Sequence, residues 1–119
     1  MRAEERDPAH LWDMREAARE VAEFVVGANL DRFRSEKLLR YAIERQVGVV
    51  ARAAVRVSPS FRSAHPEVPW DVLLDHTDLL TSERDPDDLE RVWRLATEHL
   101  PVLVPLLDRL IPPLPDDGV

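Results

Sequence analysis

Residues 35–57 carry the sequence SEKLLRYAIERQVGVVARAAVRV, which predicts one long amphipathic helix. Apolar side chains recur there every three or four residues, which is the spacing of one helix face. The run VGVVARAAV is rich in β-branched residues and would also suit a strand, but its length and its continuity with the apolar stripe favour a helix. The pair Ser58-Pro59 ends the segment, because a residue before proline avoids helical backbone angles. The stripe consists of Leu38, Leu39, Ala42, Ile43, Val47, Val50, Ala54 and Val57.

The segment before it shows the same pattern with clear start and stop signals. Asp7 is a favourable helix N-cap, and Pro8 is tolerated at the first helical position. Gly27 and Asn29 are typical residues at a helix end. We therefore expect a helix over about 8–27. Its single apolar stripe is Leu11, Met14, Ala18, Val21 and Val25.

A third helix is expected after a loop at residues 58–69, which has room for one short helical turn. Pro69 can begin this helix, and its apolar residues continue to Leu80. The segment 81–84, Thr-Ser-Glu-Arg, is typical of a break.

The last predicted helix begins at Asp85-Pro86, which repeats the start signal of the first helix. Its apolar positions continue to Leu110. Pro101 and Pro105 lie inside it, so we expect a kink or loosened hydrogen bonds there, because proline lacks the N–H that the helix requires.

The chain is long enough for one domain only. With 119 residues, a second hydrophobic core would be too small to stand alone. We predict an all-α fold, an antiparallel bundle of four to five helices with its core over about 6–111 and a frayed tail at 112–119.

Composition excludes several classes of function. The chain has no cysteine, so disulfides, thiolate metal sites and a cysteine nucleophile are ruled out. The formal net charge is −7, which disfavours indiscriminate binding to nucleic acid. No stretch approaches the roughly 20 apolar residues of a membrane span, and the N-terminus lacks an apolar signal region. We expect a cytoplasmic protein without a membrane partner.

The histidines give no sign of a metal site. None of them forms an HExxH motif or a pair spaced i, i+4 with a carboxylate. Glycine-rich phosphate loops and a nucleophile elbow are absent as well. We therefore expect neither a metal nor a cofactor. The four histidines are His10, His65, His76 and His99.

One pair of side chains on the last predicted helix could carry chemistry. Arg94 and His99 are five residues apart and could hold a phosphate and shuttle a proton, which suits RNA cleavage through the 2′-hydroxyl. The competing interpretation is a solvated helix face on which both residues occur by chance. We favour that interpretation, because the chain contains many arginines.

The aromatic residues fit packing better than chemistry. Trp12, Trp70 and Trp93 could stack on nucleic-acid bases, but their helical settings favour core or interface packing. Tyr41 is expected to pack with its hydroxyl at the rim.

Four motifs together resemble the HepT-like proteins, an all-helical family of the HEPN superfamily. The resemblance runs from about Arg6 to Ile111 and so covers nearly the whole chain. The motifs are RDPAHLWDMREAAREVAEFV at 6–25, YAIERQVGVVARAA at 41–54, FRSAHPEVPW at 61–70 and DLERVWRLATEHLPVLVPLLDRL at 88–110.

This resemblance implies a toxin of a toxin–antitoxin pair that cleaves RNA without a metal. In the family, an Arg-Asn pair begins a motif in which four to six residues separate the Arg from a His, and the Arg and His act across a homodimer cleft. A Tyr two residues past the His is where a partner nucleotidyltransferase, MntA, adds nucleotides and silences the toxin.

The sequence departs from the family at these positions. Aligned without gaps, Thr77-Asp78 stands where Arg-Asn belongs, Ser82 stands where the His belongs, and Arg84 stands where the Tyr belongs. Arg52 replaces a family Glu on the second long helix. A serine hydroxyl does not titrate near neutral pH, so it cannot act as the acid or base.

We therefore predict a HepT-like protein that has lost the family's ribonuclease site. It would act as a non-catalytic dimeric binding module that pairs with an MntA-like nucleotidyltransferase. The alternative is an active metal-independent endoribonuclease that uses Arg94 and His99. A third hypothesis is nucleotide binding, with Arg52 or Arg84 holding the phosphate.

Overall fold

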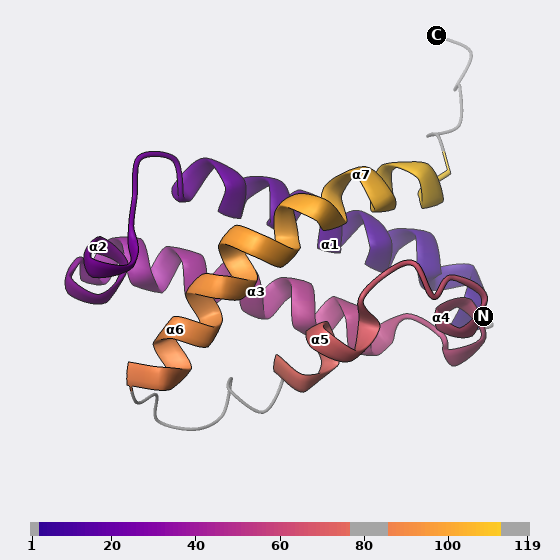
Figure 1. Cartoon of the computed structure of the whole chain (residues 1–119). Helices are drawn as coiled ribbons and strands as arrows, with labels where there is room; N and C mark the ends of the chain where they lie inside the picture. The colour runs from indigo at the N-terminus through magenta and orange to yellow at the C-terminus, as the bar shows by residue number, and fades with distance from the viewer. Residues whose placement is uncertain (1–2, 77–85, 113–119) are drawn as a thin grey trace, which may run out of the picture.

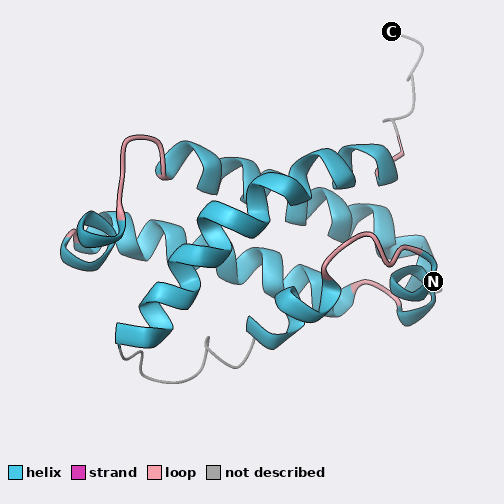
Figure 2. Ribbon diagram, in the orientation of Figure 1, coloured by secondary structure: helices cyan, strands magenta, loops and turns pink. Residues whose placement is uncertain are grey.

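The computed structural model describes residues 3–76 and 86–112, and every regular element in these ranges is helical (Figures 1 and 2). The predicted all-α helical bundle is therefore confirmed. The elements are the 3₁₀ turn η1 (Ala3–Arg6), α1 (Asp7–Phe24), α2 (Leu30–Ser35), α3 (Lys37–Arg56), α4 (Pro59–Ala64), α5 (Trp70–Asp75), α6 (Pro86–Arg94), the π-helical turn η3 (Leu95–His99) and α7 (Leu100–Leu110).

Three long elements form the core. Helices α1 and α3 run antiparallel, and the run α6–η3–α7 crosses in front of them as one continuous rod (Figure 1). The predicted apolar stripes of α1 and α3 meet in this core because each is a single face spaced for burial. The largest fully buried side chains are Phe33, Leu11, Met14, Ile43, Leu73, Leu100, Leu103, Leu107, Val21, Val47, Val50 and Val57. Leu38, which the pattern placed in the α3 stripe, is instead 87% exposed.

The first helix ends close to where the sequence predicts. It stops at Phe24, and Gly27 follows with φ of +71°, a backbone angle that glycine adopts without strain. Asn29 then caps the next helix, α2, because its side-chain oxygen accepts a hydrogen bond from the Arg32 N–H at 2.8 Å. The sequence analysis did not identify α2.

The role predicted for Asp7 needs correction. Asp7 is the first residue of α1 rather than its N-cap, and it is buried. Its carboxylate accepts hydrogen bonds from the backbone N–H of Ser58 at 2.8 Å and from the Ser58 hydroxyl at 2.6 Å. Asp7 therefore joins α1 to the start of α4. Helix α4 is the short helical turn for which the loop expected at 58–69 has room.

The aromatic residues divide between core and surface. Trp70 is buried and its indole N–H donates to the His65 carbonyl at 2.8 Å, and Trp93 packs on Phe33 with ring centroids 5.4 Å apart. Tyr41 contradicts the expectation of packing, since it is 55% exposed. Trp12 is 44% exposed and therefore lies outside the core, so of its two predicted settings the interface stays a prediction.

The third predicted helix is described only in part. Helix α5 covers Trp70–Asp75, and its predicted continuation to Leu80, the break at 81–84 and Asp85 lie outside the described residues. Nearly all of the predicted tail, residues 113–119, also lies outside them.

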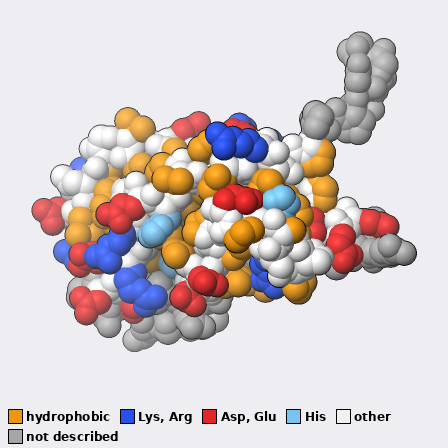
Figure 3. All heavy atoms as spheres, turned by 45° about the vertical axis from the view of Figure 1, so that its right-hand side comes forward, with side chains coloured by type: hydrophobic (Ala, Val, Ile, Leu, Met, Phe, Trp, Pro, Cys, Tyr) orange, Lys and Arg blue, Asp and Glu red, His pale blue; other side chains and the backbone are white. Residues whose placement is uncertain are grey.

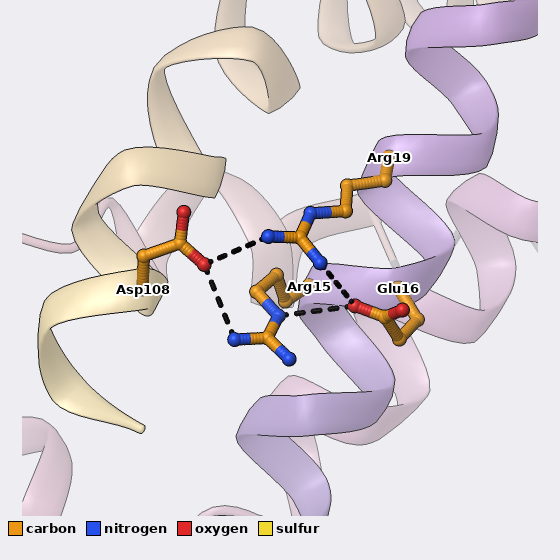
Figure 4. A network of polar contacts seen from close by, with 4 residues as sticks. All are labelled: Arg15, Glu16, Arg19 and Asp108. Carbon is orange, nitrogen blue, oxygen red and sulfur yellow. Dashed lines mark hydrogen bonds and ion pairs between the residues drawn. The ribbon is translucent and has the colours of Figure 1, made fainter. Parts of the chain in front are cut away.

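A polar network joins α1 to α7 at the surface (Figure 4). Asp108 accepts hydrogen bonds from Arg15 at 3.2 Å and from Arg19 at 3.1 Å, and Glu16 binds both arginines at 3.0 Å. These contacts hold the end of α7 against α1. In the described part of the chain, no helix has the length and apolar character to cross a membrane.

Candidate functional site

A cleft of about 150 Å³ opens between the end of α5 and the rod formed by α6 and η3. Its wall combines two apolar side chains with two arginines and two histidines. One of the histidines follows α5, and the other ends η3. The lining residues are Val72, His76, Arg91, Arg94, Leu95 and His99.

The cleft has a buried floor and an exposed rim. His76 and Leu95 are each 4% exposed, so their positions are fixed by packing. Arg91 and Arg94 lie on the exposed side of α6. Figure 3 shows a histidine beside Lys and Arg side chains on one face of the molecule, with acidic side chains close by.

Carboxylates one turn earlier on α6 hold both arginines. Arg94 lies 3.4 Å from a carboxylate oxygen of Glu90, and Arg91 lies 3.8 Å from one of Asp88. These pairs are partly exposed and therefore weak. A phosphate that entered the cleft would compete with them for the same guanidinium groups.

His99 ends a turn of π-helix rather than α-helix. In η3 the Leu100 N–H donates to the Leu95 carbonyl, five residues back instead of four. Single π turns inside α-helices are rare and are frequent at functional sites. The loosened hydrogen bonds expected near Pro101 are therefore present one residue before it.

The size and the charge of the cleft suit one phosphate group. Pockets that enclose a whole small-molecule ligand measure about 300–1,000 Å³, so this cleft is too small for a base and ribose together. Guanidinium groups bind phosphate through charge-assisted hydrogen bonds, and imidazole can transfer a proton near neutral pH. The arrangement can therefore hold a phosphate beside a proton carrier.

The predicted site residues fall into three groups. The structure brings Arg94 and His99 together in the cleft. Arg52 is exposed on α3 and does not line it. The family-motif positions and the second predicted phosphate ligand lie outside the described residues, and these are Thr77, Asp78, Ser82 and Arg84.

Sequence reasoning missed two members of the cleft. His76 was considered as a possible metal ligand, and Arg91 was not considered. Arg91 lies three residues before Arg94, so its place on the same helix face could have been noticed. The position of His76 depends on how α5 packs, which sequence spacing does not reveal.

The described residues include no group of three or more His, Cys, Asp or Glu side chains that could hold a metal ion.

Comparisons with known proteins agree on one family. The family described as Ribonuclease HepT-like matches residues 14–110. The "Putative RNase MJ1380" of Methanocaldococcus jannaschii is 28% identical over 78% of this chain and 85% of its own length. The "Probable ribonuclease HepT" of Thermococcus cleftensis is 25% identical over 85% of this chain and 92% of its own. No solved structure matches the chain.

Proposed function

Because the chain belongs to the HepT-like ribonuclease family, we propose that it cleaves RNA at the cleft that Arg94 and His99 line. Arg94 and His99 support this proposal most directly. They have the sequence spacing of the family's Arg and His, and they line one cleft. They lie on a later helix of the chain than the family's motif does. The resemblance supplies the reaction class, and the cleft supplies the groups that the family-motif positions lack.

The reaction would be an internal transfer at a phosphodiester. The imidazole of His99 accepts the proton of the 2′-hydroxyl while the 2′-oxygen attacks the adjacent phosphorus. The bond from phosphorus to the 5′-oxygen breaks, and that oxygen takes up a proton from the imidazolium or from water. Arg94 stabilises the charge that builds on the phosphoryl oxygens. The products are a 2′,3′-cyclic phosphate and a 5′-hydroxyl end.

The test is RNA cleavage by the purified protein in the presence of a metal chelator. The variant His99→Ala should lose at least a hundredfold in rate, because general acid–base catalysis contributes about 10²–10⁴. His10→Ala is the matched control, because His10 is a half-buried histidine on α1 that does not line the cleft. An RNA with 2′-deoxyribose at the scissile position should resist cleavage.

Each outcome decides the assignment. Loss of cleavage in His99→Ala but not in His10→Ala supports it, provided circular dichroism shows both variants folded. Cleavage that survives His99→Ala contradicts the role of His99. A folded wild-type protein that cleaves no RNA contradicts the proposal and favours the second candidate.

The second candidate is a non-catalytic homodimer that pairs with an MntA-like nucleotidyltransferase. The sequence favours it at the family-motif positions, where Thr77 and Ser82 replace the catalytic Arg and His. With Arg84 in place of the Tyr, the partner would bind this chain without transferring nucleotides to that position. When this protein and the nucleotidyltransferase are incubated with labelled ATP, we expect the two proteins to form a complex and Arg84 to stay unlabelled.

The homodimer itself has a candidate contact surface on α3. Leu38, Tyr41 and Val55 lie on the same side of this helix by helical spacing, and all are at least half exposed. Sedimentation should give a dimer mass for the wild type and a monomer mass for Leu38→Asp. Val26→Asp is the control, because Val26 is 78% exposed between α1 and α2, away from this face. A monomeric wild type would contradict the homodimer.

A further inference from the structure

The π turn η3 determines which side chains can share the cleft. In a regular α-helix, two residues five positions apart lie about 140° apart around the axis, because each residue turns the helix by about 100°. Arg94 and His99 would then face different directions. In a π turn the hydrogen bonds join residues five apart, so such residues lie one above the other.

Arg91 belongs to the same face. It is three residues before Arg94, a spacing that makes neighbours on an α-helix. The π turn therefore brings His99 beside two arginines that α6 already presents together, and all three line the cleft. His76 supplies the opposite wall from the end of α5.

Two features of the local sequence explain why the helix opens at this point. Pro101 has no N–H to donate to the turn before it, and its ring would collide with the carbonyl of Thr97 in a regular helix. The Thr97 hydroxyl donates to the Trp93 carbonyl at 2.8 Å and so competes with the backbone for that acceptor. Pro101 lies in the first turn of α7, where proline is tolerated.

The hydrophobic core holds the π turn in place. Leu95 and Ala96 are buried before it, and Leu100 and Leu103 are buried after it. If the turn tightened to α-helix with all its residues retained, α7 would rotate about its axis and move Leu100 and Leu103 away from the core. The wide turn thus allows both helices to bury their apolar faces while His99 faces the cleft.

We propose that η3 builds a phosphate-binding site from Arg91, Arg94 and His99, in which the π turn is the positioning element. The site recognises a single phosphate group and leaves the attached nucleosides outside, because the cleft is too small to enclose them. The ligand class is a phosphodiester or phosphomonoester without a required base. This inference deepens the site proposed above, but it does not depend on cleavage.

The decisive variant moves the histidine by one position. Glu98→His combined with His99→Ala places the histidine four residues after Arg94, where an α-helix would stack it over that arginine. In the π turn, position 98 faces away from the cleft, and Glu98 is exposed. Glu98→Gln combined with His99→Ala is the control for the charge that is removed.

The readout is the binding of inorganic phosphate, followed by the imidazole signals of the protein in NMR spectra at constant ionic strength. For the wild type we expect a saturable shift of the His99 signals. For the moved histidine we expect phosphate to bind at least tenfold more weakly. Equal binding by the two proteins would overturn the proposal, as would a wild type whose His99 signals do not respond.

A second variant keeps the test decisive if the moved histidine unfolds the protein. Deleting Thr97 removes the residue that the π turn accommodates, and Pro101→Ala in the same protein removes the ring that would collide in a regular helix. Helices α6 and α7 then keep their buried faces, and Arg94 and His99 become four residues apart in a regular helix. We expect this protein to fold and to bind phosphate within about threefold of the wild type. A folded deletion variant that no longer binds phosphate would contradict the proposal.

The two proposals can fail separately. If His99 responds to phosphate as expected but the wild type cleaves no RNA, the cleavage function is wrong and the phosphate site stands. If RNA is cleaved in a way that requires His99 while the moved histidine works equally well, the cleavage function stands and the role of the π turn is wrong.

Discussion

At the scale of single residues, the buried carboxylate of Asp7 joins two segments that lie 51 residues apart in the sequence. It satisfies both the N–H and the hydroxyl of Ser58, the residue that caps α4. Replacing Asp7 with Ala would remove the acceptor of the buried Ser58 N–H and leave the Ser58 hydroxyl with Ser60 Oγ, at 3.2 Å, as its neighbour. We expect Asp7→Ala to lower the free energy of unfolding by about 3 kcal/mol, because buried hydrogen bonds to a charged group contribute about 1.5–3 kcal/mol and unpaired donors add to the loss.

Urea denaturation at neutral pH measures this effect. The control is Asp13→Ala, which removes an exposed carboxylate from the same helix and should change the unfolding free energy by less than about 0.5 kcal/mol. Equal effects of the two substitutions would show that the contact with Ser58 contributes nothing.

Glu90 should restrain the candidate phosphate site. Its carboxylate lies 3.4 Å from Arg94 and 3.8 Å from Arg34, so it occupies guanidinium groups that a phosphate could use. Removing its charge with Glu90→Gln should strengthen phosphate binding about two- to fivefold, since one ion pair at this distance near water is worth on the order of 1 kcal/mol. Titration with inorganic phosphate measures the change.

Glu23→Gln provides the matched comparison for Glu90→Gln. It removes the same charge from an exposed position on α1, so any increase that it causes reflects net charge alone. If the two variants bind phosphate equally well, Glu90 does not compete for Arg94.

At the scale of elements, the contact between α1 and α7 combines apolar packing with the network around Asp108. The network is exposed, with side chains between 17% and 46% accessible. Asp108→Asn should therefore lower the free energy of unfolding by less than about 1 kcal/mol. The unfolding free energy lost in Asp108→Asn should be smaller in about 1 M salt, because the salt already screens these exposed ion pairs in the wild type.

Thermal and urea unfolding at low and high salt check this expectation. Leu107→Ala is the comparison, because Leu107 is fully buried on the same helix and should lose about 2–5 kcal/mol at either salt concentration. A salt-independent loss above about 2 kcal/mol in Asp108→Asn would mean that the network acts as a buried contact.

The long helices could be predicted because their signals are local. Spacing of apolar residues and the Asp-Pro and Gly signals placed α1 and α3 within a few residues of their bounds. Helix α2 was missed because six residues with Leu30 and Phe33 as their apolar side chains are too short for a periodic pattern. Leu38 was misassigned because the apolar stripe of α3 extends beyond the face that the core covers.

Of the candidate site, the sequence predicted only the spacing between Arg94 and His99. Arg94 and His99 were identified by spacing alone, and the many arginines of the chain made a chance pairing the favoured interpretation. The π turn that brings them together depends on Pro101, on Thr97 and on the core register of two helices at once. His76 enters from a helix whose packing no local pattern encodes.

At the scale of the whole molecule, an acidic protein that acts on RNA must rely on a few local positive charges. The net charge is −7, so long-range attraction to a phosphate polymer is absent. Within the cleft, Arg91 and Arg94 are the side chains with a permanent positive charge. Each neutralised phosphate of a single strand contributes about −0.7 to the slope of log K against log salt concentration, and the cleft binds one phosphate, so we expect a slope of about −0.7.

Binding of a short single-stranded RNA, made non-cleavable by 2′-deoxyribose, measures this slope at several salt concentrations. Arg91→Gln combined with Arg94→Gln should bring it close to zero, because the one phosphate contact is lost. Arg109→Gln, an exposed arginine near the end of α7, should leave it unchanged. A wild-type slope steeper than about −3 would require several more cations, and the exposed Arg45, Arg52 and Arg56 of α3 could supply them. RNA would then bind along α3, and the cleft alone would not account for recognition.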